Sequence, residues 1–219
     1  MALKCVYCKN LSCVSGNKKG PEGCPMKEHS DAIKESATFY MNPDQRKLAS
    51  NAGIVEAAGY AEWPRLREIA EFAKLMGYHK LGLAFCVGLK DEALLVSQFL
   101  EGLEFEVHSV NCKVGAIHKD EVGIPKEYQG ISKTGYAIGY STCNPVGQAL
   151  VLERAGTELN IMLGLCVGHD THFIKCSKAP ITILAAKDRV TGHNPLAVLY
   201  SHYGRTYLQK TIAEMKSSM

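Results

Sequence analysis

The stretch LNIMLGLCVGHDTHFIKC, residues 159–176, decides how this chain folds. It opens with the continuous apolar run Leu159–Leu165, and such a run beside helical patterns indicates a strand that is buried on both faces of a parallel sheet. Ligands of open α/β sheets collect just beyond the carboxyl ends of the strands, so we expect the working site to follow this run. A Gly- and His-bearing loop is predicted there, with the side chains of Cys166, His169, Asp170, His172 and Cys176.

Strand and helix patterns alternate around this stretch. Residues 81–85 and 105–110 predict strands on either side of an amphipathic helix at 91–102, and residues 180–186 predict a further strand. A helix that connects neighbouring strands in this way requires a parallel sheet and a right-handed crossover. The sequence therefore predicts a doubly wound α/β fold, Rossmann-like or flavodoxin-like, with strand order 2-1-3-4.

Helical patterns fill the chain before the first strand. One helix is expected over residues 25–41, a second starts at Asn42-Pro43, and a third begins near Trp63-Pro64 and ends at Gly77 as its C′ glycine. We expect these to be packing helices that join the amino-terminal segment to the sheet.

An insertion and further helices follow the second strand. Residues 116–141 are polar and Gly-rich without a steady period, which is typical of a functional insertion or a lid. Asn-Pro sequences then predict helices over residues 146–155 and 196–203, and a surface helix is expected over residues 204–219.

Composition limits the class of protein. The chain has 219 residues, of which 46% are hydrophobic, so it can bury a core in one medium α/β domain plus a small appendage. Its net charge of +3 is spread along the chain, which speaks against nucleic-acid binding. It lacks both a membrane-length apolar run and the apolar core of a signal peptide. We therefore expect a cytoplasmic protein with two domains, residues 1–42 and 43–219.

Nine cysteines are many for a cytoplasmic chain of this size. Disulfides are disfavoured in that compartment, and an odd number of cysteines fits a paired framework poorly. Metal ligation accounts for most of these thiols, although one or two could be ordinary buried cysteines.

The first cysteine motif lies in a loop-forming segment that has few apolar residues of its own. A bound metal would hold such a segment together, and its four thiols would be the ligands. Two C-x2-C knuckles are usual in zinc ribbons, and this segment has one. A last Cys followed by Pro is typical of ferredoxin-type 4Fe-4S runs, although the spacing here is looser. We expect a 4Fe-4S cluster, with zinc or four unligated thiols as the alternatives, at Cys5, Cys8, Cys13 and Cys24-Pro25.

Four more cysteines occupy strand ends or a helix start in the α/β half. Neighbouring parallel strands lie ~4.8 Å apart, so side chains at adjacent carboxyl ends can share one ligand. Thiolates near a helix N-terminus have a lowered pKa, which suits metal ligation and nucleophilic roles alike. The sequence predicts a second metal or cluster centre here, unless two of the thiols are core residues and the others reactive or inert. The four are Cys86, Cys112, Cys143 and Cys166.

Histidines, an aspartate and a lysine are expected near the same strand ends. His169 and His193 could ligate a centre, donate to a sulfur or act in acid–base chemistry, and Asp170 with His169 could equally cap the next helix. Lys187 could attract an anionic ligand. The sequence leaves open whether His172 and Cys176 are ligands.

The chain resembles, over nearly its whole length, the metal-binding family known as domain of unknown function 1847, found widely in anaerobic bacteria and archaea. The resemblance implies metal or cluster binding in the cytoplasm of an anaerobe and implies no particular reaction. Cys176 lies outside the family's pattern. The shared motifs are the first cysteine motif, Phe85-Cys86-Val87-Gly88, Cys143-Asn144-Pro145, Cys166-Val167-Gly168-His169-Asp170, Lys187-Asp188-Arg189 and Gly192-His193-Asn194-Pro195.

These observations predict an iron–sulfur protein with one 4Fe-4S cluster, or two if the second centre is also a cluster. Its role would be electron transfer or cluster-dependent redox or sulfur chemistry, with a redox partner protein or a small-molecule substrate. One alternative is a zinc-binding protein that stores, senses or delivers metal, and another is a thiol enzyme without a second centre. No hydrolase nucleophile elbow, P-loop or dinucleotide-binding glycine motif is present, so no catalytic residue is assigned.

Overall fold

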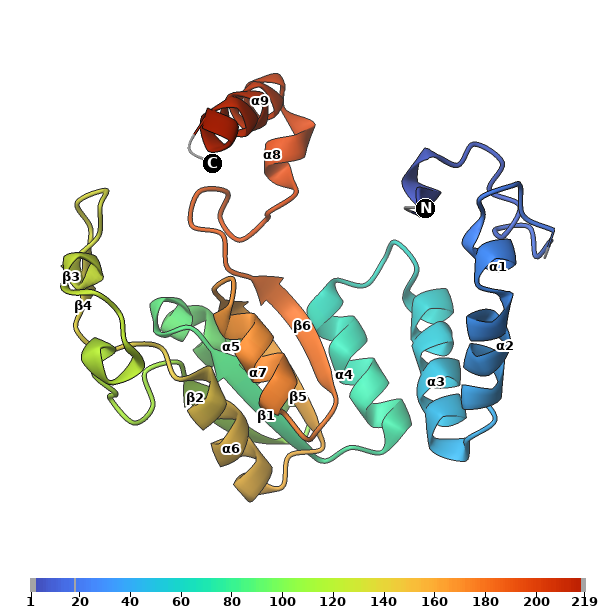
Figure 1. Ribbon diagram of the computed structural model, residues 1–219. Coiled ribbons are helices and arrows are strands. Elements are labelled where there is room, and N and C mark those ends of the chain that lie inside the picture. Colours follow the sequence, from blue (N-terminus) through green and yellow to red (C-terminus); the bar gives the residue numbers. More distant parts are fainter. Residues whose placement is uncertain (1–2, 18, 218–219) are drawn as a thin grey trace. The chain divides into compact units, whose positions relative to one another are not determined.

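The computed structural model describes residues 3–17 and 19–217 (Figure 1). The chain forms two compact units, Met1–Tyr60 and Ala61–Met219. The first unit contains the helices of the amino-terminal segment, and the second contains the sheet.

The first unit consists of a cysteine-bearing segment followed by three helices. A 3-10 turn, η1 (Cys5–Tyr7), precedes α1 (Pro25–Glu28), α2 (Ser30–Phe39) and α3 (Pro43–Gly59). Asn42 caps α3 as predicted, because its side chain accepts hydrogen bonds from two backbone N–H groups of the first turn. The single helix predicted over residues 25–41 is wrong, since the backbone leaves the helical region at His29 (φ −130°, ψ 47°) and starts again at Ser30.

The second unit is built on a four-stranded parallel sheet. Its strands are β1 (Lys80–Phe85), β2 (Glu106–Asn111), β5 (Leu159–Leu165) and β6 (Ile181–Ala186), and their order is β2-β1-β5-β6. Numbered within this sheet alone, the order is 2-1-3-4, which confirms the prediction. The carboxyl ends of all four strands therefore meet at one edge, which we call the rim.

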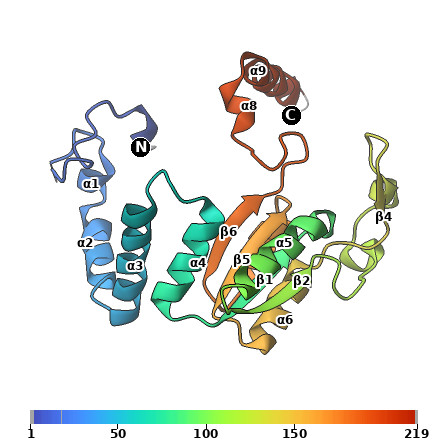
Figure 2. The same ribbon diagram turned by 180° about the vertical axis from the view of Figure 1, so that it is seen from behind.

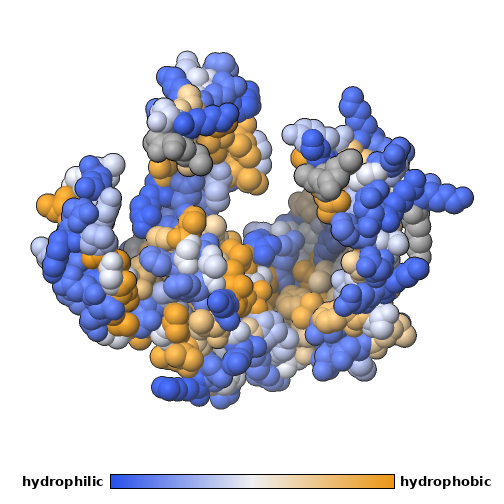
Figure 3. All heavy atoms as spheres, in the orientation of Figure 1, coloured by the Kyte–Doolittle hydropathy of each residue, from blue (hydrophilic) through white to orange (hydrophobic). Residues whose placement is uncertain are grey.

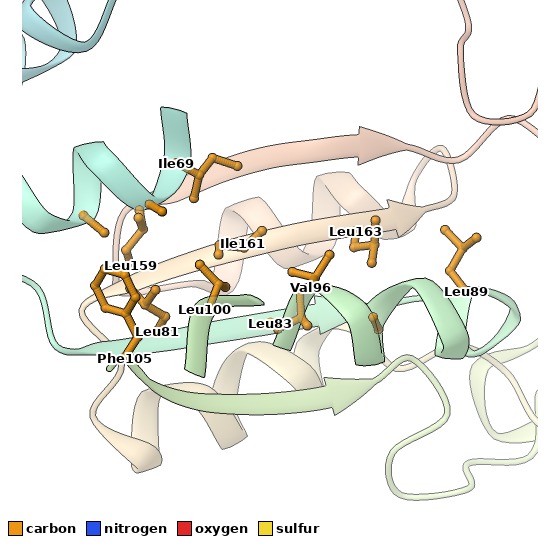
Figure 4. Packing of buried hydrophobic residues seen from close by; sticks show 13 residues of the cluster. Ile69, Leu81, Leu83, Leu89, Val96, Leu100, Phe105, Leu159, Ile161 and Leu163 are labelled. Atoms are coloured by element: carbon orange, nitrogen blue, oxygen red, sulfur yellow. The ribbon is translucent and has the colours of Figure 1, made fainter. Parts of the chain in front are cut away.

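Helices cover both faces of this sheet (Figures 1 and 2). On one face α4 (Arg65–Met76) and α5 (Lys90–Glu101) pack against β1 and β5, as Figure 4 shows with Ile69, Leu83 and Ile161. On the other face α6 (Pro145–Ala155) and α7 (His169–Cys176) pack through Leu152 and Phe173. The α4 helix ends at Gly77, whose left-handed conformation makes it the predicted C′ glycine.

The strand β5 lies in the middle of this arrangement, and every one of its residues is buried. Its pairing with β6 shifts register around Gly164, which has a φ of +67°. Its positive φ favours glycine, and a Cβ atom at Gly164 would also displace the Leu89 side chain. The buried strand predicted over Leu159–Leu165 is confirmed.

The predicted Gly- and His-bearing loop after β5 is shorter than expected, because helix α7 begins at His169. The Oδ1 atom of Asp170 accepts hydrogen bonds from the backbone N–H groups of Gly168 and Thr171. The Phe173 side chain is fully buried and anchors the helix to the sheet. Asp170 thus lies inside the first turn and bonds to backbone N–H groups there, while the N-cap position itself is Gly168.

The polar insertion after β2 folds as a series of short elements. These are η3 (Lys119–Val122), η4 (Lys126–Tyr128) and a small hairpin of β3 (Gly130–Ile131) and β4 (Ala137–Gly139). An isolated bridge between His118 and Ser141 closes the insertion at its base. Another 3-10 turn, η2 (Val87–Leu89), connects β1 to α5.

Two helices follow β6. The helix predicted over residues 196–203 is wrong in extent, because α8 covers only Ala197–Tyr200 and Ser201 is extended (φ −98°, ψ 150°). The last helix, α9 (His202–Ser217), begins before the predicted residue 204, and residues 218 and 219 of that prediction lie outside the described residues.

Apolar surface on the face drawn in Figure 3 forms separate patches among hydrophilic residues. Within residues 3–17 and 19–217, none of the helices combines the length and the apolar composition that a bilayer crossing needs.

Candidate functional site

Three cysteine side chains meet at the rim. Cys86 follows β1, Cys112 follows β2, and Cys143 stands two residues before α6. The Sγ atoms of Cys112 and Cys143 lie 3.6 Å apart, and Cys86 hydrogen-bonds to Cys112. The backbone N–H of Val87 also donates to Cys112 Sγ over 3.3 Å. Adjacent parallel strands thus bring together thiols that are far apart in the sequence, as the strand-end argument predicts.

The backbone around Asn144 holds Cys143 in this position. The Asn144 backbone N–H donates to the carbonyl of Cys112 over 2.7 Å. Its side chain caps α6 by accepting from the Gly147 N–H over 2.8 Å and also donates to the carbonyl of Val114 over 3.1 Å. Three hydrogen bonds of one residue therefore join the start of α6 to the segment that follows β2.

A buried glutamine fixes the two strand ends that precede Cys86 and Cys112. Gln148 lies on the first turns of α6 and is fully buried. Its Nε2 donates to the carbonyls of Phe85 (3.2 Å) and Val110 (2.7 Å), one at the end of β1 and one near the end of β2. These two bonds join the strand ends through one side chain, while Oε1 of Gln148 has no hydrogen-bond partner among the described residues.

Hydrogen bonds between the sulfur atoms lower the pKa of one of the three thiols and raise the pKa of the other two. The Cys112 thiol stabilises the Cys143 thiolate and lowers the pKa of Cys143 to about 7. The same bond raises the pKa of Cys112. The pKa of Cys86 is raised, first by its bond to Cys112 and then by burial. Near neutral pH the negative charge of this group therefore sits mainly on Cys143.

Cys166 adds a fourth thiol at the end of β5. It interacts electrostatically with Cys86 and Cys143, and Nη2 of Arg189 donates to its Sγ over 3.3 Å. The pKa of Cys166 is lowered, first by the His169 imidazole and then by Arg189. A partly exposed thiol with a lowered pKa beside a guanidinium can act as a ligand or as a nucleophile. Hereafter Cys86, Cys112, Cys143 and Cys166 are called the rim cysteines.

Most of the other predicted site residues also lie near the rim. Lys187 follows β6, and its Nζ lies 3.6 Å from the position that a Cβ would take on Gly88. His193 has its Nδ1 bonded to the backbone N–H of Asp188, which places it in the turn after β6. Cys176 packs against the apolar cluster beneath the rim. The exposed His172 lies on α7.

The amino-terminal cysteines belong to the first unit. A cavity of about 880 Å³ in this unit is lined by Cys5, Cys8 and Cys24, together with His29. Cys13 is exposed and lies outside this lining. The structure thus gathers three of the four predicted ligands around one cavity.

We tested the donor groups at the rim for their fit to a metal. Across the described ranges, no three His, Cys, Asp or Glu side chains are placed as ready ligands of one metal ion. The rim sulfurs instead bond to one another, but their spacing fits a metal site. Zn–S bonds of about 2.3 Å in a tetrahedron put two sulfurs about 3.8 Å apart, close to the 3.6 Å between Cys112 and Cys143.

One histidine nitrogen near the rim could also act as a metal ligand. Nδ1 of His169 is buried and makes no hydrogen bond among the described residues. The same imidazole already stabilises the Cys166 thiolate, so the ring lies next to a predicted sulfur ligand. Three thiols in contact, a fourth close by and this imidazole therefore form a donor set that suits zinc or iron.

Sequence reasoning missed two residues of this site. Arg189 stands in a motif that the sequence singled out, but nothing in the sequence placed its guanidinium on Cys166. The role of Gln148 had one indication in the sequence, because Gln148 is a polar residue within the apolar face of a predicted helix.

Comparison with known proteins confirms the family resemblance. The model of a family described as "Protein of unknown function (DUF1847)" matches residues 24–184. An uncharacterised protein of Methanocaldococcus jannaschii, MJ0455, is 40% identical over 210 residues, which cover 96% of this chain and 98% of the relative. No solved structure matches the chain. By the match over most of its length, the chain belongs to the DUF1847 family.

Proposed function

We propose that this protein carries two cysteine-bound metal centres and acts in electron transfer or in redox or sulfur chemistry on a small molecule. One centre, a 4Fe-4S cluster, is assigned to the first cysteine motif. The other, a metal ion or a second cluster, is assigned to the four rim cysteines.

The contact between thiols from three separate segments carries this proposal. Cys112 and Cys143 are 31 residues apart in the sequence, and their sulfurs lie 3.6 Å apart. Cys86 comes from a third segment and bonds to the same sulfur. Cys86 and Cys112 also belong to the apolar cluster under the rim, but Cys143 and Cys166 are only partly buried and lie at the ligand-binding edge of the parallel sheet. The 3.6 Å spacing favours a single ion over a cluster at the rim.

The surrounding residues support a site for thiolate ligands. The Val87 N–H and the Arg189 guanidinium both donate to sulfur and would stabilise its negative charge. Gln148 holds the strand ends, so the sulfurs are placed before a metal arrives. A bound iron centre would supply an electron donor or acceptor, and zinc would supply a Lewis acid.

Metal analysis of anaerobically purified protein tests the proposal. We expect iron and acid-labile sulfide in the ratio of a 4Fe-4S cluster, broad absorbance near about 400 nm, and one further metal equivalent. The variant Cys86→Ala/Cys143→Ala should lose the further equivalent and keep the absorbance. The variant Cys5→Ala/Cys8→Ala should lose the iron and sulfide. The matched control is Cys176→Ala, which removes a thiol outside both ligand sets and should keep all metal.

Two results would contradict the proposal. A colourless protein with stoichiometric zinc would remove the iron–sulfur assignment and leave a zinc-binding protein. The rim centre would be refuted if wild-type protein held no metal beyond that of the first cysteine motif and Cys86→Ala/Cys143→Ala left the metal content unchanged.

The contact between Arg189 and Cys166 favours a second candidate function, a thiol enzyme in which Cys166 is the nucleophile. Its thiolate is stabilised by a guanidinium and an imidazole, as catalytic thiolates are. Alkylation with iodoacetamide separates the two candidates. Cys166 that reacts rapidly in metal-loaded protein supports the enzyme, whereas a Cys166 protected by metal supports the rim centre.

A further inference from the structure

Four basic side chains surround the rim cysteines. Arg189 donates to Cys166 Sγ over 3.3 Å, and Lys187 reaches over Gly88 and interacts electrostatically with Cys86. Two further lysines, Lys113 and Lys119, interact electrostatically with Cys143. Two of these four cations follow β6 and the other two follow β2.

Carboxylates do not balance these cations. None of the ion pairs found within the described part of the chain includes Lys113, Lys119, Lys187 or Arg189. Asp188 stands between two of the cations in the sequence, but its Oδ1 accepts from the N–H groups of the following turn. Asp120, next to Lys119, bonds instead to Lys126 and Gln129.

Lys119 shows the imbalance most clearly, because only 7% of its surface is exposed. Its Nζ makes one long hydrogen bond, 3.4 Å to the carbonyl of Tyr128, although an ammonium has three protons to donate. Burial and the nearby Lys113 lower the pKa of Lys119. An anion beside this buried amine would stabilise its charged form, and the Cys143 sulfur supplies at most one negative charge.

The charge at the rim stays positive whether or not a metal is bound. Neutral thiols leave all four cations uncompensated. Four thiolates around one divalent ion, or around a 4Fe-4S core of charge +2, carry two net negative charges, so two positive charges remain. The Asp188 carboxylate subtracts one further charge, so the rim keeps a net positive charge in both states, which favours an anionic group.

We propose that the rim binds a small dianionic oxyanion group, of the phosphate or sulfate class, with Arg189 and Lys187 on the β6 side and Lys113 and Lys119 on the β2 side. This group would be part of the small-molecule substrate, so the inference deepens the proposed function and rests on it for the neighbouring metal centre. Arg189 provides the fork-shaped donor that binds such oxyanions in a fixed orientation.

Binding of inorganic phosphate to the full-length, anaerobically purified protein tests this inference. Isothermal titration calorimetry at low ionic strength should show one phosphate per chain, with sulfate competing and acetate competing at least about tenfold more weakly. Arg189→Gln and Lys119→Gln should each weaken phosphate binding about tenfold. The matched control is Lys175→Gln, which removes an exposed charge from α7 and should change the affinity less than about twofold.

Metal content is measured on every variant, so that the two proposals fail separately. Phosphate binding without a rim metal refutes the metal centre and keeps the anion site. A retained rim metal without phosphate binding refutes the anion site alone. Equal losses in Lys175→Gln and Arg189→Gln, or acetate that competes as well as sulfate, would overturn the dianion assignment. Arg189 is exposed, so its variant tests the site even if Lys119→Gln fails to fold.

Discussion

Replacing Cys112 with alanine should make Cys143 a weaker acid, because the bond from the Cys112 thiol is the main cause of the low Cys143 pKa. The two sulfurs lie 3.6 Å apart, and alanine removes the donor without adding a group. The pKa of Cys143 should then rise from about 7 toward its ordinary value of 9.0. Cys112→Ser is the matched control, since serine keeps a hydroxyl donor at the same position.

The size of the effect follows from the ionised fraction. At pH 7 a thiol of pKa about 7 is half ionised, whereas a thiol of pKa about 9 is about 1% ionised, which is a difference of about 50-fold. The more basic thiolate is intrinsically about eightfold more nucleophilic, because the Brønsted coefficient is about 0.4–0.5. Alkylation of Cys143 at pH 7 should therefore slow by about sixfold in Cys112→Ala.

The measurement uses metal-free, reduced protein, iodoacetamide and mass spectrometry of the Cys143 peptide from about pH 5 to about pH 10. A wild-type midpoint at or above about pH 8.5 would refute the reasoning. So would equal Cys143 rates in Cys112→Ala and Cys112→Ser at pH 7, since only one of them keeps a donor. The pKa of Cys86 is raised, so Cys86 should be alkylated more slowly than Cys143 over this whole pH range.

Of three further predictions, two concern residues that hold the site and one concerns Glu158, at the amino ends of β1 and β5. Gln148→Leu should lower the free energy of unfolding by about 2–4 kcal/mol, because the carbonyls of Phe85 and Val110 lose their donor. Gln98→Leu on the surface of α5 should change it by less than about 0.5 kcal/mol, and equal values in urea unfolding would contradict the role of Gln148. Asn144→Ala should lower the free energy of unfolding by about 1–2 kcal/mol, because the cap of α6 is lost, and Asn144→Asp should lower it less. Thermal unfolding of the two variants measures this difference. The Glu158 carboxylate accepts hydrogen bonds from two backbone N–H groups, and these lower its pKa. The ionised carboxylate therefore stabilises the folded protein above the unfolded pKa of about 4.3, and this contribution is lost as the pH falls through the lowered folded pKa. Urea unfolding at several pH values should therefore separate Glu158→Gln from wild type at pH 7 and not in acid, and a difference that persists in acid would argue against the mechanism.

The sheet could be predicted because each strand carries its own signal. The run Leu159–Leu165 is apolar at nearly every position, as a strand buried on both faces must be, and the structure buries all seven residues. Helix α7 escaped prediction, since its start depends on the side chain of Asp170 and its anchor is the single residue Phe173. The break at His29 has no counterpart in the apolar periodicity of residues 25–41.

The candidate site was predictable only in part. Strand ends are local features, so the meeting of Cys86 and Cys112 follows once the strands are known to be parallel, whereas the place of Cys143 depends on the hydrogen bonds of Asn144. The burial of Gln148 and Lys119 depends on how α6 and the insertion pack, and single residues in a sequence do not report this. Their hydrogen bonds and charges therefore emerge only from the three-dimensional arrangement.

The topology explains why the sulfurs and the cations gather at one place. All four strands are parallel, but the chain adds β2 on one side of β1 and then adds β5 and β6 on the other side. Open α/β sheets leave a crevice for ligands at such a switch point, here between β1 and β5. Helix α5 leaves β1 toward one face of the sheet, and α7 leaves β5 toward the other face, so the two connections diverge. Cys86 and Cys166 stand at the first position after these two strands, one on each side of the crevice. A ligand in this crevice would meet both thiols and the cations after β6, as both proposals require.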